Sequence, residues 1–240
     1  MTRSQRTPEI AARPPGLAGV HLFADVPEEA RARIARQCGW RRYAAQEQIL
    51  DRDCESREVY FVAQGTARII IYTVSGREVA LADVETGSFF GELAAFDGAP
   101  RSASVLAVTD CWIATLPATA FLTLLADHPP LALIVMRRLS ATIRAATERI
   151  VDLSTLGANN RVQAEVLRQA EAAGVDDAGR AVIRPIPIHA DIASRVSTTR
   201  ETVARVLNDL ARKGMVTRER DALVVHDVAR LEMLVQELTA

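Results

Sequence analysis

Short apolar runs alternate with turn residues between about Trp40 and Leu116. The runs VYFVAQG, ARIIIYTV, EVALADV, SASVLAV and CWIATL are rich in β-branched and aromatic residues. Glycines separate them at turn-like intervals, at Gly65, Gly76, Gly87, Gly91 and Gly98. Punctuated short strands of this kind are typical of an antiparallel barrel or a double-sheet jelly roll. The pattern therefore predicts one of these two antiparallel folds, and PEEARARIARQCG before it predicts a short helix with Pro27 as its first residue.

The apolar period changes to that of a helix after Pro129 and Pro130. Apolar residues then recur alternately four and three positions apart, at Ala132, Met136, Leu139, Ile143, Ala146, Ile150 and Leu153. Charged residues leave only a narrow apolar seam, the a/d pattern of a coiled coil over about three heptads. The alternative, a helix packed on its own barrel, would show a wider apolar stripe. We therefore expect the helix to pair with a second copy of itself, and Gly157 with the following ANN predicts a hinge.

The last eighty residues have the pattern of a second unit. NRVQAEVLRQAEAAG predicts a helix closed by Gly174, and VDDAGRAVIRPIPI predicts a turn-rich connection with a short strand. HADIASRV and TTRETVARVLNDLARKG predict two helices joined by a short turn, the helix-turn-helix signature, although this turn lacks glycine. Ser197, Thr198 and Thr199 supply hydroxyls that can cap the second helix. MVTRERDALVVHD then predicts a β-hairpin, or wing.

Composition and charge narrow the classes of function. The chain of 240 residues is 49% apolar and 25% charged, a balance typical of globular proteins. No apolar run approaches the ~20 residues of a membrane span, and no signal peptide follows the start. Cys38, Cys54 and Cys111 have neither metal-ligand nor disulfide spacing, so we expect a cytoplasmic protein without a membrane partner. The net charge is −1, but between Ile186 and Arg220 seven basic side chains stand against four acidic ones, which predicts a local footprint on DNA phosphates.

The stretch GELAAFDGAPRSASV, residues 91–105, holds a candidate anion site. A short helical turn behind a strand end presents free N–H groups that favour an anion. Arg101 adds a planar charge suited to two phosphate oxygens, Ser102 a hydroxyl, and Ala103 an accessible backbone. Glu92 fits beside a phosphate if the ligand also donates a hydroxyl, as a ribose does, while Glu92 also orients Arg101. Phosphate and sugar hydroxyl together indicate a nucleotide; the alternative is a surface Glu–Arg pair that closes a loop.

FGELAAFDGAPRSASV closely resembles the phosphate-binding cassette of cyclic-nucleotide-binding domains. The resemblance extends upstream through VYFVAQGTARI and ETGSFFGE, where Gly65 and Gly87 match the family's turn glycines. Asp53 replaces a usual glycine, but aspartate tolerates the left-handed conformation better than most residues. With the seam helix and the winged helix behind it, the chain from about residue 19 resembles the CRP/FNR family of bacterial transcription regulators.

The resemblance implies an α+β fold with four segments. Residues 1–18 are expected to be a disordered tail, and residues 19–129 an antiparallel β jelly-roll that forms the cyclic-nucleotide-binding domain. Residues 130–157 are expected to be the dimerisation helix and hinge, and residues 158–240 the winged helix-turn-helix domain that binds DNA.

The resemblance implies ligand contacts at Gly91, Glu92, Leu93, Arg101, Ser102 and Ala103. Glu92 would accept the ribose 2′-hydroxyl, while Arg101, Ser102 and backbone amides would hold the cyclic phosphate. Base contacts in the family come from the dimer helix, where Thr147, at an e position, and Thr142, at a g position, are alternatives. An ordinary helix-surface role is equally consistent with either threonine. We expect a 3′,5′-cyclic purine nucleotide, cyclic AMP first and cyclic GMP open, and no prosthetic group.

The resemblance also implies DNA contacts at His189, Thr198, Thr199, Arg200, Glu201 and Arg205. An arginine can bind guanine O6 and N7 together, and a glutamate accepts from cytosine N4. Arg200, Glu201 and Arg205 match the recognition helix of cyclic-AMP-type members, whereas the threonines and His189 would contact the DNA backbone. The alternative is a solvated charged helix face. We expect a homodimer on palindromic, TGTGA-like DNA, with RNA polymerase as a further partner.

Other classes fit the sequence less well. Iron–sulfur or haem sensing would need a cysteine cluster or a suitably placed histidine, and the chain's spacing offers neither. A metal-dependent enzyme of the cupin type would need several ligands inside the barrel, but no histidine lies between His21 and His128. A regulatory module of a kinase or channel would lack the winged helix. We therefore expect no enzyme, and the main alternative is a regulator of the same family that needs no nucleotide.

Overall fold

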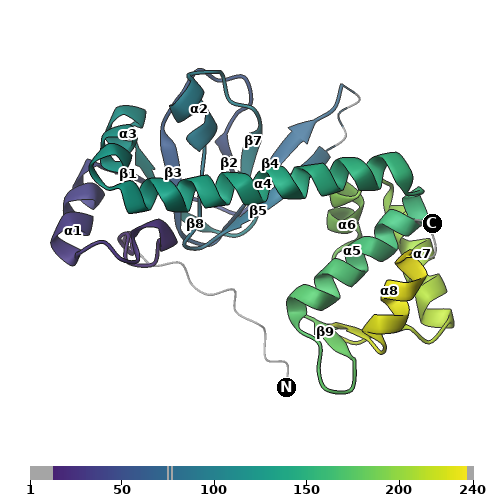
Figure 1. Cartoon of the computed structure of the whole chain (residues 1–240). Coiled ribbons are helices and arrows are strands. Elements are labelled where there is room, and N and C mark those ends of the chain that lie inside the picture. Colours follow the sequence, from purple (N-terminus) through teal and green to yellow (C-terminus); the bar gives the residue numbers. More distant parts are fainter. Residues whose placement is uncertain (1–12, 75, 77, 237–240) are drawn as a thin grey trace. The chain divides into compact units, whose positions relative to one another are not determined.

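The structure is a computed structural model that describes residues 13–74, 76 and 78–236. Contacts within the chain divide it into two compact units, with the division between Ser140 and Ala141. That division falls inside one long helix, α4 (Pro129–Thr155), and not at residue 130 or residue 157, where the sequence predicts the domain limits. Each unit is described below by itself (Figure 1).

Two four-stranded antiparallel sheets form the first unit, with strand orders β1-β8-β3-β6 and β2-β7-β4-β5. The strands are β1 (Gly39–Tyr43), β2 (Gln48–Leu50), β3 (Val59–Gln64), β4 (Thr66–Tyr72), β5 (Glu78–Glu85), β6 (Phe89–Phe90), β7 (Ser104–Ala107) and β8 (Cys111–Leu116). Each of the predicted runs contains a strand, so the predicted jelly-roll is confirmed. Strands β1, β2 and β6 are not predicted from the sequence, because they are short or rich in polar residues.

Strand β3 explains how the layers of this unit are held together. Tyr60 and Val62 point into a core between the two sheets, whereas Val59 and Phe61 belong to a second core under the helices. Both faces of the strand are therefore covered, and it reads as a continuous apolar run. The helices of this layer are the 3-10 helix η1 (His21–Phe23), α1 (Glu28–Gln37) and α3 (Ala118–Asp127), together with the first part of α4.

The N-terminal limit of this unit differs from the prediction. Residues 1–12 of the predicted tail lie outside the described residues, but Leu17 is 2% exposed and packs in the helical core with Val20. Packing therefore begins before residue 19. Pro27 is the N-cap of α1 and not its first helical residue, since α1 begins at Glu28.

Left-handed turns occur where the sequence predicts them. Gly65 has a φ of +94°, and an added Cβ there would lie 2.3 Å from the carbonyl oxygen of Asp110. Only glycine can make this close turn between β3 and β4. Asp53, which replaces a usual glycine, has a φ of +64°, so the expectation that aspartate preserves this turn is confirmed.

The apolar residues of helix α4 are buried in its first part and exposed in its later part. In its first part, Leu131 and Val135 are buried against the helical core of the roll, with Leu139 partly buried beside them. Further along, the seam residues Ile143 and Ile150 are 66% and 64% exposed. The first part therefore packs on its own barrel, as the alternative interpretation has it, while the later part presents an uncovered apolar seam.

The second unit is a winged helix-turn-helix domain, as predicted. Its elements are α5 (Ala158–Ala173), β9 (Ala181–Ile183), α6 (His189–Arg195), α7 (Arg200–Arg212), β10 (Val216–Arg218), β11 (Leu223–Val225) and α8 (Val228–Gln236), with the antiparallel sheet order β10-β11-β9. Val203, Val206 and Leu210 form the buried stripe of α7. In the turn before α7, Ser197 adopts a φ of +53° and so takes the left-handed position that glycine often fills. The sequence analysis missed α3 and α8.

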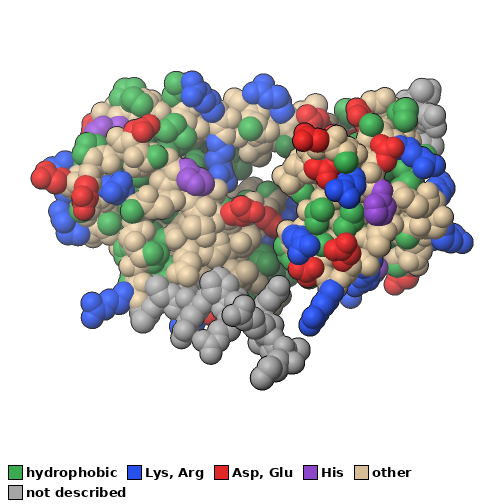
Figure 2. Space-filling model, turned by 90° about the horizontal axis from the view of Figure 1, so that it is seen from below, with side chains coloured by type: hydrophobic (Ala, Val, Ile, Leu, Met, Phe, Trp, Pro, Cys, Tyr) green, Lys and Arg blue, Asp and Glu red, His purple; other side chains and the backbone are tan. Residues whose placement is uncertain are grey.

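Surface charge and hydropathy add two observations. On the face shown in Figure 2, acidic and basic side chains are interspersed on both units, in keeping with the net charge of −1. Among the described residues no single helix is long and apolar enough to cross a membrane. Helices α3 and α4 meet the criteria of length and composition only as a pair that bends by 114°.

Candidate functional site

The stretch 91–105, called the cassette below, starts at a left-handed glycine between β6 and α2 (Glu92–Asp97). Gly91 has a φ of +83°, and an added Cβ would lie 2.8 Å from Nη1 of Arg101 and 3.1 Å from the ring of Tyr60. A side chain at this position would push the guanidinium away. Glycine is therefore required both by the turn and by the close approach of Arg101.

Arg101 is buried at 3% exposure and anchors the cassette through three hydrogen bonds. Its Nη1 donates to the carbonyl oxygen of Gly91 at 2.7 Å, its Nη2 to that of Glu58 at 2.7 Å, and its Nε to Oγ of Ser56 at 3.0 Å. The guanidinium also lies 5.4 Å from the ring centroid of Tyr60. A guanidinium has five N–H groups, and these bonds use three of them.

The acidic partner of Arg101 differs from the expectation. From the sequence we expect Glu92 to orient Arg101, but the carboxylate in ion-pair range is that of Glu58, 3.6 Å from Nη2. Glu58 directly precedes β3, and its backbone carbonyl also accepts from Arg101, so chain geometry places it at the guanidinium. Glu92 instead begins α2 and is half-buried.

All six predicted ligand residues of the cassette line one cavity of about 70 Å³. They are Gly91, Glu92, Leu93, Arg101, Ser102 and Ala103. Leu50, Ile69 and Val105 contribute apolar walls. Ligand pockets commonly measure about 300–1,000 Å³. A nucleotide at this position would therefore extend out of the cavity into solvent or displace its walls.

Arg138 on α4 is a neighbour of the cassette that the sequence analysis missed. Its Nη2 donates to the carbonyl oxygen of Phe89 at 2.7 Å, and its guanidinium lies 4.5 Å from the centroid of the Phe89 ring. Burial raises the pKa of Glu92 above its ordinary value, and the charges of Arg138 and then Arg101 oppose that rise. Only the fold brings Arg138 here, because it lies 49 residues from Phe89 along the chain.

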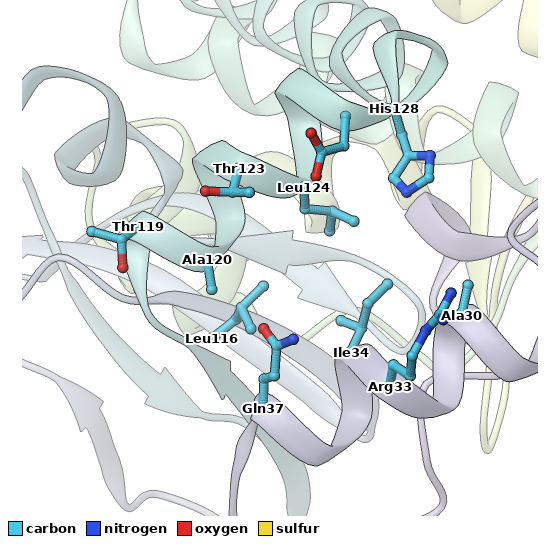
Figure 3. A pocket seen from close by; sticks show the side chains of 11 residues that line it. Ala30, Arg33, Ile34, Gln37, Leu116, Thr119, Ala120, Thr123, Leu124 and His128 are labelled. Carbon is cyan, nitrogen blue, oxygen red and sulfur yellow. The ribbon is translucent and has the colours of Figure 1, made fainter.

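A larger groove lies between α1 and α3 (Figure 3), apart from the cassette. Its volume is about 440 Å³, and its apolar floor includes Ile34 and Leu116. The polar residues along it are Arg33, Gln37, Thr119, Thr123, Asp127 and His128. All six are exposed, so no buried polar group marks this groove as a built ligand site.

The exposed face of α7 holds the predicted base-reading side chains. Arg200, Glu201 and Arg205 are exposed, on the side opposite the buried stripe of this helix. The amide of Glu201 itself and the hydroxyl of Thr199 hydrogen-bond the Glu201 carboxylate and lower its pKa, so it is an acceptor at neutral pH. Nη2 of Arg205 donates to Oδ1 of Asn159 on α5 at 3.1 Å, a contact that the sequence analysis missed.

Thr199 is the N-cap of α7, and its Oγ1 accepts from the amide of Thr202 at 3.3 Å, so the predicted cap is confirmed. Thr198 lies in the turn before it, and His189 is the first residue of α6. Thr142 and Thr147 are exposed on α4, and Oγ1 of Thr147 donates to the carbonyl oxygen of Ile143 at 3.0 Å. These two threonines belong to the second unit, whereas the cassette belongs to the first.

The described part of the chain contains no cluster of metal-binding side chains and no disulfide. No group of three or more His, Cys, Asp or Glu side chains is placed to hold a metal ion there. Cys38, Cys54 and Cys111 are free thiols. The two candidate sites are therefore the cassette cavity on the roll and the charged face of α7 on the second unit.

Two family models match this chain. Residues 40–128 match a cyclic nucleotide-binding domain, and residues 160–234 match a Crp-like helix-turn-helix domain. The two matches together cover more than half of the chain and coincide with the two sites. The chain belongs to the CRP/FNR family of transcription regulators. The family consists of regulators and not enzymes.

Curated relatives of this CRP/FNR member are named as cyclic-AMP-activated regulators. The CRP-like cAMP-activated global transcriptional regulator of Mycobacterium tuberculosis is 25% identical over 193 residues, which are 80% of this chain and 86% of that protein. The cAMP-activated global transcriptional regulator Vfr of Pseudomonas aeruginosa is 27% identical over 185 residues, 74% of this chain and 85% of that protein.

Solved structures share the fold of this CRP/FNR member. A CooA mutant from Carboxydothermus hydrogenoformans has a TM-score of 0.79 at 21% identity and covers 90% of this chain and 95% of its own. A CRP/FNR family transcriptional regulator from Thermus thermophilus has a TM-score of 0.63 at 27% identity and covers 82% of this chain and 98% of its own.

Arg101 is expected to stabilise the ligand-free protein. Replacing it by glutamine leaves the half-buried Gly91 and Glu58 without the guanidinium donor to their carbonyls, so Arg101→Gln should lower the free energy of unfolding by at least about 2 kcal/mol. Ser102→Ala is the matched control, because Ser102 is exposed, and should change it by less than about 0.5 kcal/mol. Urea unfolding without nucleotide measures both values. Equal stabilities of wild type and Arg101→Gln would contradict this role.

Glu92 should make the stability of the ligand-free protein depend on pH. Its pKa is raised in the folded state above an ordinary value of 4.5, so the folded state binds more protons than the unfolded state in this range. The free energy of unfolding should therefore fall as pH rises from 4.5 through the folded-state pKa of Glu92. Glu92→Gln should remove this fall, whereas Glu85→Gln, at an exposed position, should retain it. Urea unfolding from pH 4.5 to 8 measures this dependence. Identical profiles for wild type and Glu92→Gln would exclude an effect of Glu92 on the pH dependence of stability.

Proposed function

We propose that this chain is a homodimeric transcription regulator whose affinity for DNA is raised by a 3′,5′-cyclic purine nucleotide. The observation that carries the proposal is the cavity lined by the six predicted ligand residues of the cassette, with the buried Arg101 at its wall. The same chain exposes a charged recognition helix on its second unit. Because its partner is chromosomal DNA, we place the protein in the cytoplasm, with RNA polymerase as a further partner.

The chemistry of the cavity supports a nucleotide with a cyclic phosphate. Arg101, the hydroxyl of Ser102 and backbone amides of the cassette would donate to the phosphate oxygens. The carboxylate of Glu92 lies in the same cavity and accepts the ribose 2′-hydroxyl. Thr142 or Thr147 would contact the base. Cyclic AMP comes first, because relatives at 25% and 27% identity are named as cyclic-AMP-activated, and cyclic GMP is the competing ligand.

Recognition of DNA would follow from the exposed face of α7. Arg200 and Arg205 would bind guanines in the major groove, and the ionised Glu201 would accept from cytosine N4. Thr198, Thr199 and His189 would contact the DNA backbone. In a two-fold symmetric dimer these helices would occupy half-sites about 34 Å apart on palindromic DNA.

The seam on α4 supports self-association. Met136, Ile143, Ile150 and Leu153 are between 43% and 66% exposed, and they follow the a/d spacing. Exposed apolar residues in such a row are stabilised when a second helix covers them. A second copy of this chain carries the same row and is the partner we propose.

Gating would follow from linkage between the two sites. A nucleotide raises DNA affinity only if it binds more tightly to the dimer geometry that presents both recognition helices. DNA must then raise nucleotide affinity by the same factor. The nucleotide therefore acts as an allosteric ligand and is not consumed.

A regulator that needs no nucleotide is the second candidate. The observation that favours it is the small volume of the cassette cavity, about 70 Å³, together with an Arg101 that already donates three hydrogen bonds within the protein. In that case the cassette arginine would be a structural residue only.

Nucleotide titration separates these two candidates. Isothermal titration of cyclic AMP and cyclic GMP into the wild type should give saturable binding of at least one nucleotide. Ser102→Ala should weaken that binding about tenfold through the loss of one hydrogen bond to a charged group, without changing the ligand-free fold. The exposed Thr119→Ala, outside the cassette, should bind as the wild type does. Negligible heats from the wild type with both nucleotides would reject the ligand assignment.

DNA selected from a random pool should contain a palindrome with TGTGA-like half-sites. Glu201→Ala should relax the preference at one base pair of each half-site, by roughly 1–3 kcal/mol, more than it weakens overall binding. The selection is repeated with this variant, and affinities for the original and altered sites are compared. A wild-type selection that yields no palindrome would rule out this mode of recognition.

Dimerisation should depend on the exposed seam. Ile143 and Ile150 have no part in the core of either unit, so replacing both by aspartate should leave the fold intact but give monomers. Sedimentation velocity measures the mass, and circular dichroism checks the fold. Arg144→Asp, beside the seam, is the control. A double variant that remains dimeric would exclude this seam as the interface.

A further inference from the structure

Arg161, in the first turn of α5, contacts three carbonyl oxygens in two different segments of the second unit. Its Nη1 donates to Leu156 at 2.8 Å, its Nε to Val196 at 2.9 Å and its Nη2 to Ser197 at 3.3 Å. Leu156 lies between α4 and α5, whereas Val196 and Ser197 form the turn between α6 and α7. One half-buried side chain therefore connects the end of α4 to the helix-turn-helix turn.

These carbonyls lie near helix ends, where backbone carbonyls no longer accept a hydrogen bond within the helix. The amide of Leu156 still donates to Asp152 in α4 at 2.9 Å, and Val196 is the C-cap of α6. The last carbonyls of a helix have no partner within that helix, and a cation near them is favourable. Arg161 supplies donors and positive charge to two helix ends at once. A lysine cannot match its planar array of donors.

The turn that Arg161 holds leads directly into the recognition helix. Ser197 has the left-handed φ of +53°, and Thr199, two residues later, caps α7. The amide of Thr198 donates to the carbonyl oxygen of Ala193 in α6 at 2.9 Å, so this segment has little freedom. A movement of Leu156 relative to α5 would therefore change the contacts that set where α7 begins.

The same turn of α5 also contacts a base-reading side chain. Oδ1 of Asn159 accepts from Nη2 of Arg205 at 3.1 Å. Arg161 thus contacts the turn before α7, and Asn159 contacts one of the exposed arginines of α7. Both residues, Asn159 and Arg161, lie shortly after Gly157, where the sequence predicts a hinge.

We propose that Arg161 is a positioning residue that transmits the state of the α4–α5 hinge to the recognition helix. It acts through the carbonyls of Leu156, Val196 and Ser197 and touches neither the nucleotide nor the DNA bases. The inference rests on the proposed function, because it assigns to Arg161 a part of the coupling between nucleotide and DNA. Asn159 supports it by holding Arg205 while DNA is absent.

A purely structural role makes a different prediction from a coupling role. If Arg161 only stabilises the domain, its replacement lowers DNA affinity by the same factor with and without nucleotide. If Arg161 transmits the hinge state, the ratio of the two DNA affinities falls while nucleotide affinity without DNA is unchanged. The ratio therefore separates the two roles.

The experiment uses the full chain with Arg161→Lys, which keeps the charge, and Arg161→Gln, which removes it. Arg230→Gln, at an exposed position on α8, is the control. Fluorescence anisotropy measures the Kd for a selected palindrome with and without saturating cyclic AMP, or cyclic GMP if that is the nucleotide that binds. Titration without DNA measures nucleotide affinity, and circular dichroism checks the fold.

Both Arg161 variants should bind nucleotide within about twofold of the wild type, but the nucleotide-induced gain in DNA affinity should fall at least about fivefold. Arg230→Gln should keep the full gain. An unchanged gain in either folded Arg161 variant, or failure of both to fold, would overturn the inference. A wild type whose DNA affinity does not respond to nucleotide would instead reject the proposed function, so the two failures are distinguishable.

Discussion

The hydrogen bonds of one buried charged side chain, Arg101, join the segments of the roll next to the candidate ligand site. Arg101 joins the start of α2, through the carbonyl of Gly91, to the loop before β3, through Ser56 and the carbonyl of Glu58. A buried guanidinium is tolerated only where hydrogen bonds compensate for its lost hydration, and these acceptors do so. The same guanidinium has five N–H groups, and these bonds use three of them. Under the proposed function, folding of the cassette and recognition of its ligand would depend on the same side chain.

The second unit repeats this arrangement with another arginine. Arg161 donates hydrogen bonds to the carbonyls of Leu156, Val196 and Ser197. In the same way, Arg101 donates to the carbonyls of Gly91 and Glu58. In both cases an arginine satisfies backbone groups that turns and helix ends leave unpaired. Along the chain, α4 connects the two arrangements: its first part packs in the roll, while its later apolar residues are exposed. Under the proposed function, α4 is therefore an element through which binding at one site could change affinity at the other.

Much of the fold could be predicted because its signals are local. Short apolar runs bounded by turn residues predicted β3, β4, β5, β7 and β8, and the period of the helical segments predicted α4, α5 and α7. The two-residue β6 and the polar β1 carry too few apolar positions to be recognised, since pairing with neighbouring strands defines them. The cassette residues were predictable because they lie close together in sequence. The limit of the N-terminal tail was placed too late, because the burial of Leu17 depends on a core built from distant segments.

The sequence by itself determined which residue types stand in the cassette and on the recognition helix, since a short motif and a helical period need only neighbouring residues. The partners of those residues were decided by tertiary structure. Glu58 lies 43 residues from Arg101, Phe89 lies 49 from Arg138, Val196 lies 35 from Arg161, and Asn159 lies 46 from Arg205. A local pattern cannot identify such partners, because sheet pairing and helix packing bring them together only when the whole unit folds.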